Sequence, residues 1–135
     1  MATHSIEGLY QAIGEEAVST AGRELGGRLL LYAEVQKDAV SADVLYATRN
    51  GEVQLVLGED RLVDLVYELW EQWQKEPGNQ AWQVMTYLVE PNGRLTIDLA
   101  YPDDLDQGED VIDRRPRAIR KFFGNAKVNQ PNPFD

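Results

Sequence analysis

The sequence contains no cysteine, one histidine and only three serines among its 135 residues. The lack of cysteine excludes disulfides, thiolate metal sites and cysteine nucleophiles, and nothing indicates an oxidising compartment. His4 lies beside the N-terminus, where the neighbouring sequence supplies no partner for ligand binding or proton transfer. Because nucleophilic catalysis needs a base beside the nucleophile, this composition argues against a hydrolytic triad.

Long apolar segments and nucleotide-binding loops are also missing. No stretch approaches the roughly 18 apolar residues of a membrane helix, and MATHSIEGLYQAIGEE lacks the basic region and apolar run of a secretory signal. Neither GxGxxG nor GxxxxGK[ST] occurs, which argues against a phosphate-binding loop. We therefore expect a cytoplasmic protein that is not an enzyme, has no cofactor and does not contact a membrane.

Positive charge is scarce, because 13 lysines and arginines face 23 acidic residues and leave a net charge of −10. This charge repels phosphate backbones and anionic lipids and attracts basic proteins and cations, so direct nucleic-acid binding is disfavoured. The length predicts one domain with one core over residues 1–135. The hydrophobic content of 43% is that of a folded domain, unlike a disordered acidic tail.

Alternating apolar residues predict an α+β domain with a single antiparallel sheet of about five strands. A three-stranded meander is expected over residues 29–57, in which 36–43 form a hairpin loop and Asn50-Gly51 forms a tight turn. A second hairpin, from Trp82 to Tyr101, is expected to turn at Asn92-Gly93.

Three helices are expected around this sheet. The first follows the N-cap Ser5 and stops at Gly26-Gly27, and a short third one follows the cap Asp113 and ends at Gly124-Asn125. Residues 125–135 are expected to form an irregular tail. The apolar residues expected to dock the third helix are Ile119, Phe122 and Phe123.

The long central helix is expected from residue 60 to residue 75 and carries an apolar stripe with two tryptophans. An aromatic stripe can line a ligand site, but this spacing is typical of a helix that covers a sheet, so we assign the tryptophans to the core. The residues of the stripe are Leu62, Val66, Leu69, Trp70 and Trp73.

Negative charge is concentrated in residues 98–113, DLAYPDDLDQGEDVID, which hold seven carboxylates and no cation. Such a segment cannot be buried, so we expect it on the surface after the last strand, where Asp98 points away from the core. The cations that follow are expected to pair with these carboxylates and not with nucleic acid. These cations are Arg114, Arg115, Arg117, Arg120 and Lys121.

The acidic segment does not have the spacing of a calcium loop. A loop starting at Asp104 puts Gly108 at the fifth position, where an Asp or Asn is required, and one starting at Asp103 puts Arg114 at the bidentate twelfth position. We therefore assign no metal site, and a purely solubilising acidic surface remains an alternative.

Several segments, in order, resemble the YezG-like immunity proteins of bacterial polymorphic toxin systems. They are LLLYAEV at 29–35, the long tryptophan-containing helix, AWQVMTYLVEPNGRLTIDLAYPDDL at 81–105, and DRRPRAIRKFFG. The resemblance implies a protein that neutralises a cognate toxin, typically a nuclease domain. Tyr101, Asp103, Asp104 and Leu105 fall on the family's aromatic-acidic turn. Pro102 and the acidic extension from Gln107 to Asp110 depart from the family's pattern and make the turn longer and more negative.

The charge pattern and the resemblance together predict a binding surface for a basic toxin. A nuclease presents cations to a phosphate backbone, and a rigid acidic surface can occupy the same groove. Two alternatives stay open, a small-ligand or cation-binding domain and a homo-oligomeric protein whose sheet edges pair. The predicted partner-binding residues are Asp98, Tyr101, Asp103, Asp104, Asp106, Glu109 and Asp110.

Overall fold

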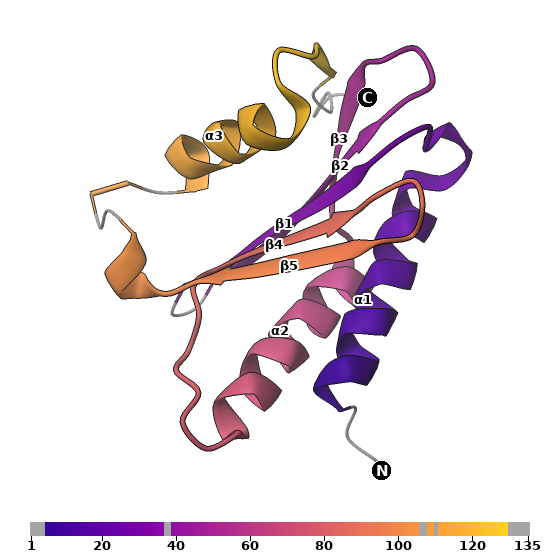
Figure 1. Ribbon diagram of the computed structural model, residues 1–135. Coiled ribbons are helices and arrows are strands. Elements are labelled where there is room, and N and C mark those ends of the chain that lie inside the picture. The colour runs from indigo at the N-terminus through magenta and orange to yellow at the C-terminus, as the bar shows by residue number, and fades with distance from the viewer. Residues whose placement is uncertain (1–4, 37–38, 106–107, 110, 130–135) are drawn as a thin grey trace.

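The computed structural model describes residues 5–36, 39–105, 108–109 and 111–129, with the backbone alone for residues 111 and 112. It has an α+β fold, in which one six-stranded sheet of order β5-β4-β1-β2-β3-β6 has two helices on one face and one on the other (Figure 1). Within these residues, no helix combines the length and apolar character needed to cross a membrane.

The first five strands pair with one another in antiparallel orientation, as predicted. The meander consists of β1 (Leu29–Gln36), β2 (Ala39–Ala47) and β3 (Val53–Leu57), and the second hairpin of β4 (Val84–Val89) and β5 (Leu95–Ala100). β1 pairs with both β2 and β4, so it joins the two hairpins at the centre of the sheet. The two hairpins expected from the Asn-Gly turns are confirmed.

The prediction that residues 36–43 form a loop is wrong. β2 begins at Ala39, which pairs with Gln36 of β1, so the hairpin is much tighter than expected. Its polar residues suggested a loop, yet Asp43 is buried in the strand because Arg115 Nη1 donates a hydrogen bond of 2.7 Å to its carboxylate. The alternation rule expects an apolar residue at this buried position of β2, but the strand has Asp43, which is paired with Arg115.

A short parallel strand makes the sheet mixed and adds a sixth strand to the expected five. β6 (Val128–Asn129) pairs with β3, and the Val53 N–H donates to the Lys127 carbonyl at 2.8 Å. The prediction of an irregular tail is therefore wrong at residues 128–129, while residues 130–135 lie outside the described residues. Two residues are too few to show an alternation, so this strand had no signal in the sequence.

α1 (Ile6–Ala21) begins at the predicted cap, where the Gly8 N–H donates to Ser5 Oγ at 3.0 Å. It ends earlier than expected, at Gly22 with a φ of 68°, and the short helix η1 (Gly22–Glu24) follows. Gly26 has a different role: a Cβ there would lie 2.5 Å from the Arg49 backbone nitrogen, so only glycine allows the two segments to touch.

α2 (Asp60–Lys75) lies beside α1 on the same face of the sheet (Figure 1). The predicted stripe is confirmed at Leu62, Val66 and Leu69, and Leu65 is buried as well. The predicted packing role of the tryptophans is also confirmed, because both pack against the cluster under α1 and α2. The Trp70 and Trp73 indoles donate to the carbonyls of residues 82 and 80, which ties the α2–β4 connection to the helix.

α3 (Val111–Phe123) covers the opposite face (Figure 1). It starts two residues before the predicted cap Asp113, which lies in its first turn, where its negative charge faces the positive end of the helix dipole. Pro116 lies inside the helix and leaves one intrahelical hydrogen bond unformed. The docking residues and the end before Gly124, whose φ is 63°, agree with the prediction.

The interior is divided into two apolar clusters, which corrects the expectation of a single core. One cluster lies between the sheet and the pair α1 and α2, and the other between the sheet and α3. Because neighbouring strand residues point to opposite faces, β1 is buried on both sides from Leu29 to Val35. Because each face of the sheet carries an apolar cluster, residues that follow β5 can pack against either of them.

Gly58 provides a stability test of the packing between β2 and the start of α2. Its N–H donates to the Ala42 carbonyl at 2.7 Å, and a Cβ would lie 2.4 Å from that oxygen. Gly58→Ala is expected to lower the free energy of unfolding by about 1 to 3 kcal/mol, because the two backbones must separate. Urea denaturation followed by tryptophan fluorescence measures this change.

The matched control for this test is the neighbouring Glu59→Ala. Glu59 is exposed and makes no capping hydrogen bond with its side chain, so its loss is expected to change stability by less than about 0.5 kcal/mol. Equal unfolding midpoints for the two variants would contradict the close contact at Gly58.

Candidate functional site

β5 places two predicted site residues on opposite faces of the sheet. Asp98 is exposed on the face that carries α3, whereas Tyr101, directly after β5, packs half-buried against the cluster under α1 and α2. The expectation that Asp98 points away from the first core is confirmed. Tyr101 anchors the chain where it leaves the sheet.

The turn after Tyr101 has a defined backbone. Its short helix η2 (Pro102–Asp104) is closed by two hydrogen bonds: the Asp104 N–H donates to the Tyr101 carbonyl at 2.8 Å, and the Tyr101 N–H donates to Asp104 Oδ2 at 3.2 Å. Leu105 then packs on the α3 side of the sheet. The turn is therefore attached on both faces, to one cluster through Tyr101 and to the other through Leu105.

The carboxylates of this region differ in their availability. Asp98 and Asp103 are exposed, and in the described part of the chain neither carboxylate takes part in a hydrogen bond or ion pair. Asp104 is also exposed, with one oxygen used by the turn. We call these three residues the acidic surface. Asp106 and Asp110 lie outside the described residues.

Glu109 is already paired within the chain. The Arg117 guanidinium donates two hydrogen bonds to its carboxylate, one of them 2.8 Å long. These bonds hold the pKa of Glu109 below its ordinary value and raise the pKa of Arg117. Glu109 therefore offers little net charge to a partner, and the predicted pairing of the α3 cations with the acidic segment is confirmed at this position.

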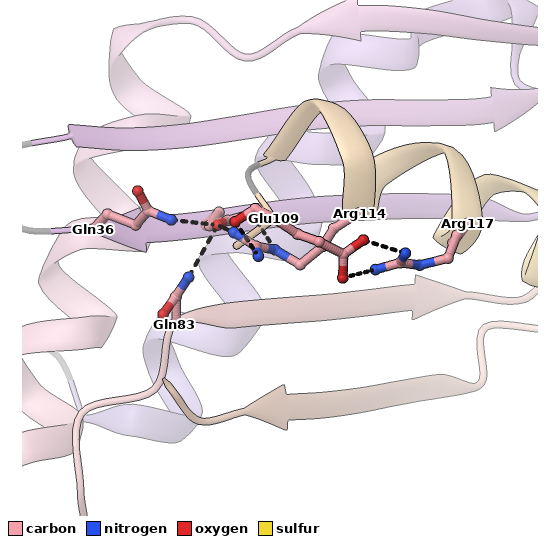
Figure 2. Close-up of polar contacts among 6 residues, drawn as sticks. Gln36, Gln83, Glu109, Arg114 and Arg117 are labelled. Atoms are coloured by element: carbon pink, nitrogen blue, oxygen red, sulfur yellow. Dashed lines mark hydrogen bonds and ion pairs between the residues drawn. The ribbon is translucent and has the colours of Figure 1, made fainter. Parts of the chain in front are cut away.

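Arg114 pairs with a residue that the sequence did not single out. Its guanidinium donates to Glu34 of β1, and both side chains are buried, with 6% and 3% exposed. The amides of Gln36 and Gln83 donate to the same carboxylate at 2.8 and 3.2 Å. Figure 2 shows Gln36, Gln83 and Arg114 converging at the start of α3, with the Arg117–Glu109 pair beside them.

The buried polar cluster attaches α3 to the sheet. Arg115 pairs with Asp43 of β2, and at the other end of α3 Arg28 donates to the Phe122 carbonyl at 2.6 Å and to Glu90 at 2.9 Å. The predicted pairing of the α3 cations with the acidic segment is therefore wrong for Arg115, whereas Arg114 pairs with Glu34 and also donates to the Glu109 carbonyl at 2.9 Å. The sequence contained one sign of these buried ion pairs: a single carboxylate lies inside each of the apolar segments LLLYAEV and SADVLY.

The Glu34 carboxylate is the centre of this cluster. It accepts hydrogen bonds from Gln36, Gln83 and Arg114, so one buried side chain of β1 joins α3 to the sheet. Burial and the neighbouring Glu34 raise the pKa of Tyr32 from its ordinary value of 10.0 to about 12. This pKa is higher in the folded chain than in the unfolded chain, so the protonated phenol stabilises the folded state. That stabilisation is fully present below about pH 10 and is lost as the pH rises through about 12.

Metal binding finds no support among the described residues. Over the described ranges, three or more acidic or histidine side chains nowhere come together as a group that could hold a metal ion. Asp98, Asp103 and Asp104 thus do not form such a group in the described part of the chain.

Comparisons with known proteins do not assign this chain to a family. No family model matches the sequence, and no significant match occurs among curated proteins.

Proposed function

We propose that this protein is an antitoxin of the immunity type, which binds a basic toxin domain and keeps it inactive. The observation that carries the proposal is the pair of exposed carboxylates of Asp98 and Asp103, which no cation of the described chain neutralises. The resemblance of residues 29–35 and 81–105 to YezG-like immunity proteins supports the same function. A nuclease domain is the partner that this chemistry fits best, because its substrate groove is cationic.

The attachment of the turn supports a role in recognition. Tyr101 and Leu105 dock on opposite faces of the sheet, and Asp104 closes the backbone between them. A surface whose backbone is already fixed loses less entropy when it binds, which favours affinity. In this proposal Asp98 and Asp103 steer the toxin, while Tyr101 and Asp104 hold the shape of the surface.

Three of the proposed site residues differ in how well they can test this proposal. Glu109 is paired with Arg117, and its carboxylate also lies beside α3, so replacing it would disturb the helix as well as the charge. Replacing Asp98 or Asp103 changes only the surface charge, because neither carboxylate has a partner among the described residues. They are therefore the better residues for testing whether charge steers the partner.

The double variant Asp98→Asn/Asp103→Asn is expected to capture the toxin more slowly. The partner to test is the product of the adjacent reading frame, and stopped-flow fluorescence measures its association with this protein. We expect the association rate constant to fall roughly 3- to 10-fold at low salt, because opposite charges accelerate encounter. The difference should shrink at physiological salt, where charges are screened beyond about 8 Å.

The matched control is Asp64→Asn/Glu71→Gln, which removes the same charge from the exposed face of α2. It is expected to leave the association rate nearly unchanged. The proposal fails if both double variants slow association equally, or if the Asp98/Asp103 variant associates as fast as the parent and still protects cells. The acidic surface would then serve solubility alone.

A further inference from the structure

An apolar groove runs along α1 on the face of the sheet opposite Asp98. It has a volume of about 810 Å³, and its floor and walls are formed by Tyr10, Val18, Tyr87, Val89, Leu95 and Ile97. Leu95 of β5 is 47% exposed and Val18 of α1 is 38% exposed, so apolar surface from both walls reaches solvent.

The groove exists because the helix layer is narrower than the sheet. A helix is about 10 Å wide and strands lie about 4.8 Å apart, so one helix covers about two strands. α1 and α2 are the helices on this face within the described residues, and the sheet has six strands, so the two helices do not reach both of its edges. At the β5 edge Leu95 is exposed, and Val89 and Ile97 are only partly buried.

The groove is preformed by a specific contact between α1 and β4. The Tyr87 hydroxyl donates to the Tyr10 carbonyl at 2.7 Å, and a Cβ at Gly14 would lie 2.4 Å from that hydroxyl. The floor is therefore fixed before anything binds.

The charges around the groove select the sign of an occupant. Glu7 and Glu15 lie on its α1 wall, and the described residues that line it include no lysine or arginine. A second copy of this chain would bring a net charge of −10 toward the same sign, which disfavours self-association here. A segment with an apolar stripe can pack on the floor of the groove, and lysines or arginines beside that stripe can pair with Glu7 and Glu15.

We infer that this groove binds an amphipathic, basic α-helix of a partner protein, laid beside α1 across β4 and β5. The α1 wall extends from Glu7 to Ser19, a rise of about 18 Å, which matches a helix of about 12 residues. The inference is independent of the acidic surface, because Ile97 and Asp98 point to opposite faces of β5. It adds a second binding site to the proposed one.

A synthetic peptide tests this inference directly. The probe is a fluorescein-labelled helical peptide of about 14 residues, with leucines at helical spacing and lysines beside them, and fluorescence anisotropy measures its dissociation constant. Leu95→Asp is expected to weaken binding about 10-fold or more, and Glu7→Gln/Glu15→Gln by about 3-fold at low salt. The matched control Leu57→Asp changes an apolar residue that is 57% exposed outside the groove and is expected to leave binding unchanged.

Several outcomes would overturn the inference. The peptide could fail to bind at millimolar concentration, bind equally well with glutamates in place of lysines, or bind Leu95→Asp as well as the parent. A proline-containing peptide of the same composition that bound equally would indicate strand addition at β5 instead of a helix. A dimer in sedimentation that Leu95→Asp dissolves would assign the groove to a second copy. Val18→Asp, on the α1 wall, replaces Leu95→Asp if that variant does not fold.

Discussion

Replacing Arg114 with methionine is expected to lower the free energy of unfolding by about 3 to 5 kcal/mol. The Glu34 carboxylate would stay buried, with the two glutamine amides as its remaining donors among the contacts described above. An uncompensated buried charge costs far more than the ion pair contributes, so the loss exceeds that of a surface pair. Urea denaturation with tryptophan fluorescence measures stability, and amide hydrogen exchange shows whether α3 loosens first.

A compensating change separates buried charge from lost packing. In Glu34→Leu/Arg114→Met both charges are absent, so we expect stability to return to within about 1 kcal/mol of the parent. The matched control is Arg117→Met, which breaks the exposed pair with Glu109 and is expected to cost less than about 1 kcal/mol. If Arg114→Met and Arg117→Met cost the same, the buried pair does not hold α3 as described.

Leu69→Asp is expected to be the second strongly destabilising change. Leu69 lies in α2 and is fully buried against the sheet. Truncating a buried leucine to alanine costs about 2 to 5 kcal/mol. Aspartate adds the cost of a buried charge without a partner, so we expect the melting temperature to fall by more than 10 °C or the variant to remain unfolded, a shift of roughly that size following from several kcal/mol.

Gln74→Asp is the control on the same helix. Gln74 is exposed, and its amide donates to the Trp70 carbonyl of its own helix at 3.0 Å. Its replacement is expected to lower stability by less than about 1 kcal/mol. Circular dichroism melting compares both variants with the parent, and similar melting temperatures would show that the stripe of α2 faces solvent.

The fold was largely accessible from the sequence where the signal is local. Asn50-Gly51 and Asn92-Gly93 mark the two tight turns, and apolar alternation marks the strands they join. The stripe containing Leu62, Val66 and Leu69 identified the buried face of α2. These features depend on residues a few positions apart, so a linear pattern suffices to find them.

The candidate site was accessible only in part. Strand alternation correctly placed Asp98 on the outer face, and charge density identified the acidic turn. The sequence could not show that Glu109 is paired with Arg117 while Asp103 has no partner among the described residues. A charged side chain can be expected on the surface from its own sequence, but its partner depends on the tertiary structure.

The sequence by itself determined the fold class, the two hairpins, the buried face of α2 and the negative charge of the surface. The tertiary structure alone decided that Glu34 and Asp43 are buried, since their partners on α3 lie 80 and 72 residues away. It also decided the β6 pairing and the uncovered groove beside β5. The physical reason is that burial and pairing depend on which distant segments meet, whereas composition and periodicity describe only neighbours along the chain.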